Sequence, residues 1–270
     1  MTVASGPRSR RFARPGPNTA LGVLGFVGFL GLLEIVPRSG MVSPLYLPPV
    51  SQIAGALVDE LQTASFWTAV GDTVRGWSIG LAIAVVLGVV VGVLLGSIPV
   101  LRDLTASTVE FLRPIPSVAL IPLAVLVFGA DLRSTLLLVV YAAFWQVLIQ
   151  VLNGVQDVDP VARDTALTFG LGWRSRIRYV TWPTALPYVL TGLRLAAAVA
   201  LILTITAELI IGTPGLGNEI GVAQSGGAVA TMYALVVVTG LIGVGVNLLA
   251  RALEKALLGW HPSVRGQVQA

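Results

Sequence analysis

Six apolar segments, each close to the length that crosses a lipid bilayer as a helix, constrain this chain most strongly. They lie at residues 19–36, 76–97, 110–129, 134–153, 186–211 and 229–250. A helix of about 20 residues spans the hydrocarbon core. Helix is required there because lipid offers no partner for free backbone groups. Only 11% of the residues are charged and the mean hydropathy is +0.87. We therefore predict an all-α integral membrane protein with six transmembrane helices.

Arginine and lysine mark alternate connections between these segments. With the N-terminal tail inside, the inner regions are residues 1–18, 98–109, 154–185 and 251–270. Together with the adjoining Arg113 and Arg194 they hold fourteen of the seventeen basic residues. Such a bias indicates the cytoplasmic side, so both termini are predicted to be cytoplasmic. The predicted organisation is a disordered basic tail (1–18), a transmembrane domain (19–255) with a polar central loop (about 155–185), and a C-terminal tail (256–270).

The residue types needed for catalysis are scarce. The chain has no Cys, so it has no thiolate metal site. Its one His, His261, lies in the tail, and its one Lys, Lys255, follows Glu254, so the Gly-Lys-Ser/Thr sequence of a phosphate-binding loop is absent. We predict a non-catalytic protein with no metal site, no cofactor of its own and no nucleic-acid partner.

Polar side chains inside the apolar segments are candidates for a solute pathway, because they are costly in a membrane. Gln146, Gln150 and Asn153 share one face of the fourth segment, and Thr204 and Glu208 are four residues apart in the fifth. The candidate set is Tyr141, Gln146, Gln150, Asn153, Thr204 and Glu208. Two interpretations stay open: these residues line a solute path, or they form structural hydrogen bonds between helices.

Glycine and proline predict how two segments pack. The second segment carries a small residue at every fourth position: Gly76, Gly80, Ala84, Gly88, Gly92 and Gly96. The first carries glycine at every third: Gly22, Gly25, Gly28 and Gly31. Such stripes let helix backbones approach closely, and we expect both to pack within the chain rather than at a dimer seam. Pro114 and Pro116 predict an irregular start to the third segment, which is expected to face the bundle interior.

The central loop is predicted to hold two short helices. Asp159 is a candidate N-cap with Pro160 at the first helical position, so one helix is expected from there to about residue 169. Gly170 and Gly172 interrupt it. A second helix over residues 173–181 carries three arginines and is expected to end before Pro183. Spacing alone leaves open whether this loop lies on anionic lipid or docks into another protein.

The loop resembles the EAA motif of bacterial ABC importer permeases, E-A-A-x3-G-x9-I-x-L-P. The matching residues, at unchanged spacing, are Asp164, Thr165, Ala166, Gly170, Val180, Trp182 and Pro183. The stretches FLRPIPSVALIPLAVLVFG, GVQDVDP, WPTALPYVLTGLRLA and AELIIGTPGLGNEI are similar to permeases for nitrate, aliphatic sulfonates and taurine. The resemblance covers roughly residues 45–255, and departs most from the motif at Thr165 and Trp182.

This resemblance implies a type I importer in a bacterial inner membrane. Two permease copies would form the pathway, two cytoplasmic ATPases would bind ATP and Mg, and an extracytoplasmic binding protein would deliver the solute. The loop helix would couple the permease to the ATPase. The residues assigned to coupling are Ala162, Asp164, Thr165, Ala166, Phe169, Gly170 and Pro183.

Two other functions compete with this one. A proton- or ion-coupled carrier would use Glu208 and would transport without an ATPase. A membrane enzyme would need catalytic groups that the composition does not supply. The solute itself is left open between a small organic molecule and an oxyanion such as a sulfonate, taurine or nitrate. The segments contain no central Arg, which argues weakly against a strongly anion-selective pathway.

Overall fold

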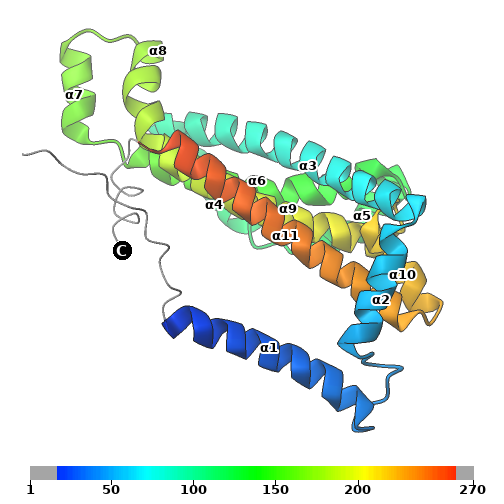
Figure 1. Cartoon of the computed structure of the whole chain (residues 1–270). Coiled ribbons are helices and arrows are strands. Elements are labelled where there is room, and N and C mark those ends of the chain that lie inside the picture. The colour runs from blue at the N-terminus through cyan, green and yellow to red at the C-terminus, as the bar shows by residue number, and fades with distance from the viewer. Residues whose placement is uncertain (1–16, 260–270) are drawn as a thin grey trace, which may run out of the picture.

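The computed structural model describes residues 17–259, and every element in that range is a helix (Figure 1). The predicted tails lie mostly outside the described residues. In chain order the elements are α1 (Pro17–Arg38), α2 (Val50–Leu61), α3 (Ala64–Ser97), α4 (Pro99–Leu112), η1 (Ser117–Leu120), α5 (Ile121–Phe128), α6 (Leu132–Gln156), α7 (Pro160–Thr168), α8 (Trp173–Arg176), η2 (Ile177–Thr181), α9 (Trp182–Ile211), α10 (Leu216–Ser225) and α11 (Val229–Leu257).

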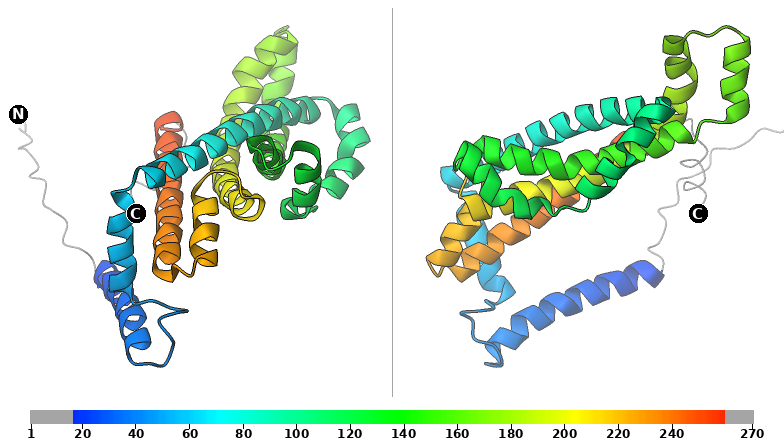
Figure 2. Two further views of the ribbon diagram at one scale, coloured as in Figure 1. Left: turned by 90° about the vertical axis from the view of Figure 1, so that its right-hand side faces the viewer. Right: turned by 180° about the vertical axis from the view of Figure 1, so that it is seen from behind.

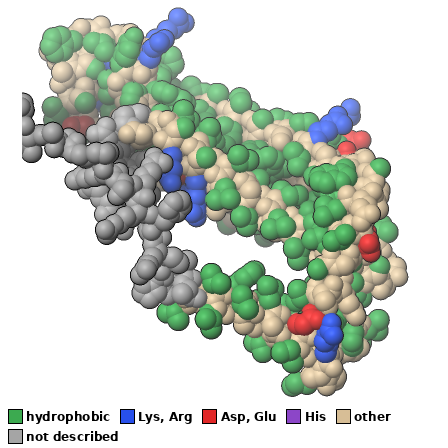
Figure 3. Space-filling view, viewed as in Figure 1, with side chains coloured by type: hydrophobic (Ala, Val, Ile, Leu, Met, Phe, Trp, Pro, Cys, Tyr) green, Lys and Arg blue, Asp and Glu red, His purple; other side chains and the backbone are tan. Residues whose placement is uncertain are grey.

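The predicted number of membrane spans is confirmed if one bent pair of helices is counted as a single span. Five helical stretches of the described chain are long and apolar enough to cross a membrane, and α4 with η1–α5 forms a sixth, bent by 82°. Hydrophobic side chains cover much of the surface of these helices (Figure 3). The predicted fold class, an all-α multi-pass membrane protein, agrees with this architecture.

The third predicted span is wrong in detail. Residues 98–109, expected to form an inner connection, lie almost entirely in the helix α4 (Pro99–Leu112), and the break falls at residues 113–116. Pro114 and Pro116 each remove a backbone N–H and so cannot continue the helical ladder. The expectation of irregular backbone at this point is correct. The following helix, α5, buries Ile121 and Ala124 but leaves Leu126 exposed, so only one of its faces points into the bundle.

The core of the bundle forms where the small residues of α3 meet the valines of α6. A Cβ atom added at four of the glycines would lie 2.5–2.8 Å from a valine side chain. The facing pairs are Gly80–Val139, Gly88–Val147, Gly92–Val151 and Gly96–Val155. Four-residue spacing on both helices keeps these pairs in register along the contact. The packing interpretation of this stripe is therefore correct, and α9 packs beside the same two helices (Figure 2).

The glycine stripe of α1 behaves differently, and its predicted packing within the chain is wrong. Helix α1 lies apart from the bundle in all views (Figures 1 and 2). No described atom lies within 4 Å of a Cβ built on its glycines. Its attachment is at the far end, where the Glu34 carboxylate accepts hydrogen bonds from the Ser51 amide and hydroxyl, both at 2.9 Å. The helix is joined to the rest of the described chain through α2.

Candidate functional site

Helix α7 stands away from the end of the bundle together with α8 (Figure 1). It begins as predicted, with Pro160 at the first helical position and the Asp159 side chain accepting a hydrogen bond from the Val161 amide at 2.8 Å. It ends in a left-handed turn at Gly170, whose φ is +72°. The Gly170 amide donates to the Leu167 carbonyl and the Leu171 amide to the Ala166 carbonyl, which is the Schellman arrangement.

One face of α7 is apolar and open to the surroundings. Val161, Thr165 and Phe169 lie four residues apart and so share this face, with Ala162 beside them. Val161 is 71% exposed and Phe169 is 78% exposed. A large aromatic ring and a valine held in the open on a projecting helix are typical of a surface that another protein covers.

The other residues assigned to coupling are placed differently. Ala166 is 7% exposed and lies on the side of α7 that faces η2. Gly170 forms the turn, and Asp164 is exposed on a different side of the helix from Thr165. Pro183 is half-buried in the first turn of α9. The structure thus brings three of the seven, Ala162, Thr165 and Phe169, onto one exposed face, and it gives the others separate positions.

The second loop helix does not end before Pro183, so that prediction is wrong. The chain stays helical from Trp173 to Ile211. A π-helical turn, Ile177–Thr181, ends two residues before Pro183. The widened turn accommodates the proline, whose ring and missing N–H disrupt ordinary α-helical bonding. As a result the loop is joined to the membrane segment of α9 without a hinge.

Glu208 is held in a closed hydrogen-bond cluster rather than in an open channel. Its side chain is 2% exposed, and its Oε2 accepts hydrogen bonds from the Thr73 hydroxyl at 2.9 Å and from the Gly217 amide at 3.0 Å. The Thr73 oxygen in turn accepts from the Leu216 amide at 2.8 Å. The cluster therefore fastens the start of α10 onto α3 and α9. These contacts favour the structural interpretation of Glu208.

Sequence reasoning missed Thr73, the partner of Glu208. A usable signal was present, because Thr73 stands three residues before Gly76 and so continues the small-residue stripe of α3 toward its N-terminus. A polar residue on a packed stripe must find its partner on the neighbouring helix. The identity of that partner, 135 residues away, could not be read from the sequence.

The remaining pathway candidates fall into separate places. The Tyr141 hydroxyl donates to the Leu112 carbonyl at 2.6 Å, at the broken end of α4. Thr204 is buried and bonds to the Ala200 carbonyl of its own helix. Gln146 and Gln150 are half-buried beside Gly192 of α9, and Asn153 is exposed. Only the three amide side chains remain together on one face.

Comparison with known proteins gives a consistent family assignment. The model of the family described as binding-protein-dependent transport system inner membrane component matches residues 63–259. The taurine transport system permease protein TauC of Escherichia coli (strain K12) is 32% identical over 83% of this chain and 84% of its own length. The riboflavin transport system permease protein RibX of Chloroflexus aurantiacus is 30% identical over 89% of this chain and 91% of its own length.

A further relative and two solved structures are also similar to this chain. A putative aliphatic sulfonates transport permease protein, SsuC of Bacillus subtilis (strain 168), is 29% identical over 86% of this chain and 84% of its own length. A structure of the MetNI methionine ABC transporter in an inward-facing conformation matches over 71% of this chain and 95% of the matched chain, with a TM-score of 0.61 at 19% identity. A structure of an amino acid ABC transporter matches over 72% of this chain and 92% of the matched chain, with a TM-score of 0.57 at 20% identity. These two structures share the fold.

Proposed function

Because the chain belongs to the family of binding-protein-dependent transport system inner membrane components, and so is the transmembrane subunit of an ABC importer, we propose that α7 is its coupling helix. The observation that carries this proposal is the apolar face of α7, exposed at Val161 and Phe169 on a helix that projects beyond the bundle. The partner that covers this face is a cytoplasmic ATPase subunit. The arginine bias of the loop supports its cytoplasmic location.

The continuous helix from Trp173 to Ile211 supports a mechanical role for the loop. A displacement of α7 reaches α8 through the short turn at Gly170, and from α8 onward no break absorbs it before the end of α9. Packing of α9 against α3 and α6 then carries the displacement into the membrane bundle. ATP and Mg act on the ATPase subunits. The permease subunits then move as rigid bodies between outward-open and inward-open arrangements.

The solute path is proposed to lie between two copies of this chain. The amide side chains of Gln146, Gln150 and Asn153 form one polar strip on α6, with Asn153 exposed in the single chain. A polar strip of this kind is costly against lipid. If the strips of two copies faced each other across a water-filled path, water would hydrogen-bond to the amides and remove that cost. An extracytoplasmic binding protein delivers the solute to the opposite end from α7.

The solute is proposed to be a small organic molecule or oxyanion, of the type represented by taurine and sulfonates. The names of two relatives, for taurine and aliphatic sulfonates, support this class. A third relative is named for riboflavin, so similarity alone spans more than one class. Binding measurements on the partner binding protein would identify the solute directly.

Protection of a single cysteine on α7 tests the coupling assignment. The chain has no Cys, so Phe169→Cys introduces one unique thiol at an exposed position. Assembly with the ATPase is expected to slow its alkylation by about tenfold or more, because the centre of a protein interface excludes solvent. Met41→Cys, 80% exposed in the connection between α1 and α2, is the control and should react at the same rate with and without the ATPase. Equal rates at Phe169→Cys would contradict the assignment.

The turn at Gly170 allows a second test that separates backbone strain from side-chain size. No atom of the described residues lies within 4 Å of a Cβ built on Gly170, so the positive φ is what constrains this position. Left-handed backbone costs most L-residues about 1–2 kcal/mol, a factor of about 5–30 in a population, and Asn tolerates it best. ATP-driven uptake should therefore fall severalfold in Gly170→Val and stay near the wild-type rate in Gly170→Asn. Similar losses in both variants, at equal membrane levels, would show that side-chain size matters instead.

A further inference from the structure

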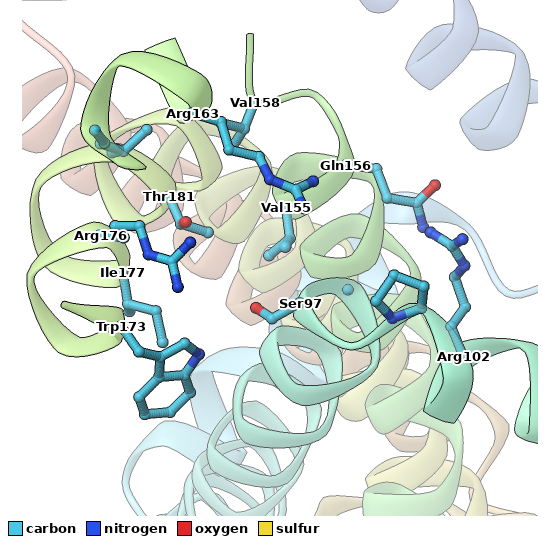
Figure 4. Close-up of a pocket in the computed structure, with 14 residues that line it drawn as sticks. Ser97, Arg102, Val155, Gln156, Val158, Arg163, Trp173, Arg176, Ile177 and Thr181 are labelled. Carbon is cyan, nitrogen blue, oxygen red and sulfur yellow. The ribbon is translucent and has the colours of Figure 1, made fainter. Parts of the chain in front are cut away.

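A cavity of about 390 Å³ lies at the base of the loop, where the ends of α3 and α6 meet α7 and α8. Three arginines line it, from three different helices: Arg102, Arg163 and Arg176. In the close-up the guanidinium groups of Arg163 and Arg176 point into the same space, with the Ser97 hydroxyl below them (Figure 4). No Asp or Glu is among the lining residues.

Two of the three arginines in this cavity carry a positive charge that no acidic residue pairs with in the part of the chain that the structure describes. Arg163 and Arg176 take part in no ion pair there and in no side-chain hydrogen bond. The Nε of Arg176 is buried without any partner. Arg102 meets only its neighbour Asp103, with Nε and Oδ1 3.5 Å apart. A buried donor left without an acceptor costs about 1–3 kcal/mol, and more when it is charged. An anion that accepted hydrogen bonds from these arginines would remove that cost.

We propose that this cavity binds a phosphate-class oxyanion, supplied either by the headgroup of an anionic phospholipid or by free phosphate. Guanidinium groups pair with such oxygens in a planar, two-bond geometry. Ser97 and Gln156, which also line the cavity, add neutral donors. The site lies where α3 and α6 end, and the indole of Trp173 at its edge is of the kind enriched at membrane interfaces.

An oxyanion in this cavity joins parts of the chain that are otherwise weakly connected. It would contact Arg163 on α7, Arg176 on α8 and Ser97 at the end of α3 at the same time. The bound group thereby fixes α7 against the bundle, with the apolar face of α7 left free. The binding site follows from the cavity alone, whereas its effect on transport rests on the proposed coupling role of α7.

The test uses the full chain assembled with its ATPase in detergent. Native mass spectrometry measures retention of phosphatidylglycerol against phosphatidylcholine, and thermal unfolding compares phosphate with chloride at equal ionic strength. The test variant is Arg163→Gln/Arg176→Gln. The control, Arg174→Gln/Arg178→Gln, removes the same charge from exposed positions outside the cavity. We expect about tenfold weaker binding in the test variant and less than about twofold change in the control, because charge-assisted hydrogen bonds are lost only in the former.

The two arms identify the source of the anion. A preference for phosphatidylglycerol that disappears in the test variant identifies lipid, and a phosphate-dependent Tm that disappears identifies the free ion. The proposal is overturned if lipid retention and the phosphate-dependent Tm are the same in the test variant and the control. This includes the case in which the test variant loses only its binding to the ATPase, a result that would assign the arginines to a carboxylate of that partner. If the test variant does not assemble, the wild-type complex decides: equal retention of the two lipids and equal Tm in phosphate and chloride overturn the proposal. The cysteine-protection result for α7 is independent of either outcome.

Discussion

Replacement of Glu208 by Ala is expected to destabilise the folded protein by about 2–6 kcal/mol, because two buried donors lose their acceptor at about 1–3 kcal/mol each. The donors are the Thr73 hydroxyl and the Gly217 amide. Thermal unfolding of the purified protein in detergent measures the loss. The same variant should transport poorly, because the start of α10 is no longer fastened to α9 and keeps only the Leu216–Thr73 hydrogen bond to α3.

Glu208→Gln is the matched control for this cluster. It keeps an oxygen that accepts both hydrogen bonds, so most of the stability and most of the ATP-driven uptake should remain. An importer that used Glu208 to carry a proton would instead lose transport completely in this variant while keeping its Tm. Wild-type stability in Glu208→Ala would show that the hydrogen-bond cluster is not needed. The ion-coupled carrier, considered from the sequence, finds no support in the family assignment.

A second large effect is expected where α3 packs on α6. In Gly88→Ala/Gly92→Ala each new methyl group meets a valine side chain at 2.7–2.8 Å, and the Leu148 backbone nitrogen lies 3.2 Å from the first. Overpacking of this kind costs about 1–3 kcal/mol per site, so the double variant should lose more than about 2 kcal/mol of stability. Denaturant or thermal unfolding in detergent measures the change.

Gly71→Ala provides the control on the same helix. No described atom lies within 4 Å of its added Cβ, and alanine is favoured over glycine in a helix by about 0.5–1 kcal/mol. The same chemical change is therefore expected to leave stability unchanged or to raise it slightly. A loss in Gly71→Ala equal to that of the double variant would mean that helix packing is not the cause.

The membrane spans and helix α7 could be predicted from the sequence because their signals are local. Apolar length determines a span, and the order Asp159, Pro160, Gly170 supplies a start and a stop for one short helix. The glycine stripe of α3 was predicted to pack within the chain for the same reason, since four-residue spacing defines a face. In each case the information lies within one helix.

The errors arise where one segment decides the shape of another. Pro183 is a local signal for a helix end, yet the π-helical turn before it lets the helix continue. At the break of the bent third span, the Leu112 carbonyl accepts a hydrogen bond from the Tyr141 hydroxyl of α6. The stripe of α1 looks like that of α3, but no part of the described chain reaches it. Spacing within one helix shows a surface without showing what covers it.

Uptake into proteoliposomes tests the central claim most directly. Vesicles would contain this chain and its ATPase, with the binding protein and its labelled ligand outside and ATP inside. We expect accumulation only when ATP, the ATPase and the binding protein are all present. Accumulation driven by a proton or sodium gradient, in vesicles that hold this chain without the ATPase, would contradict the account.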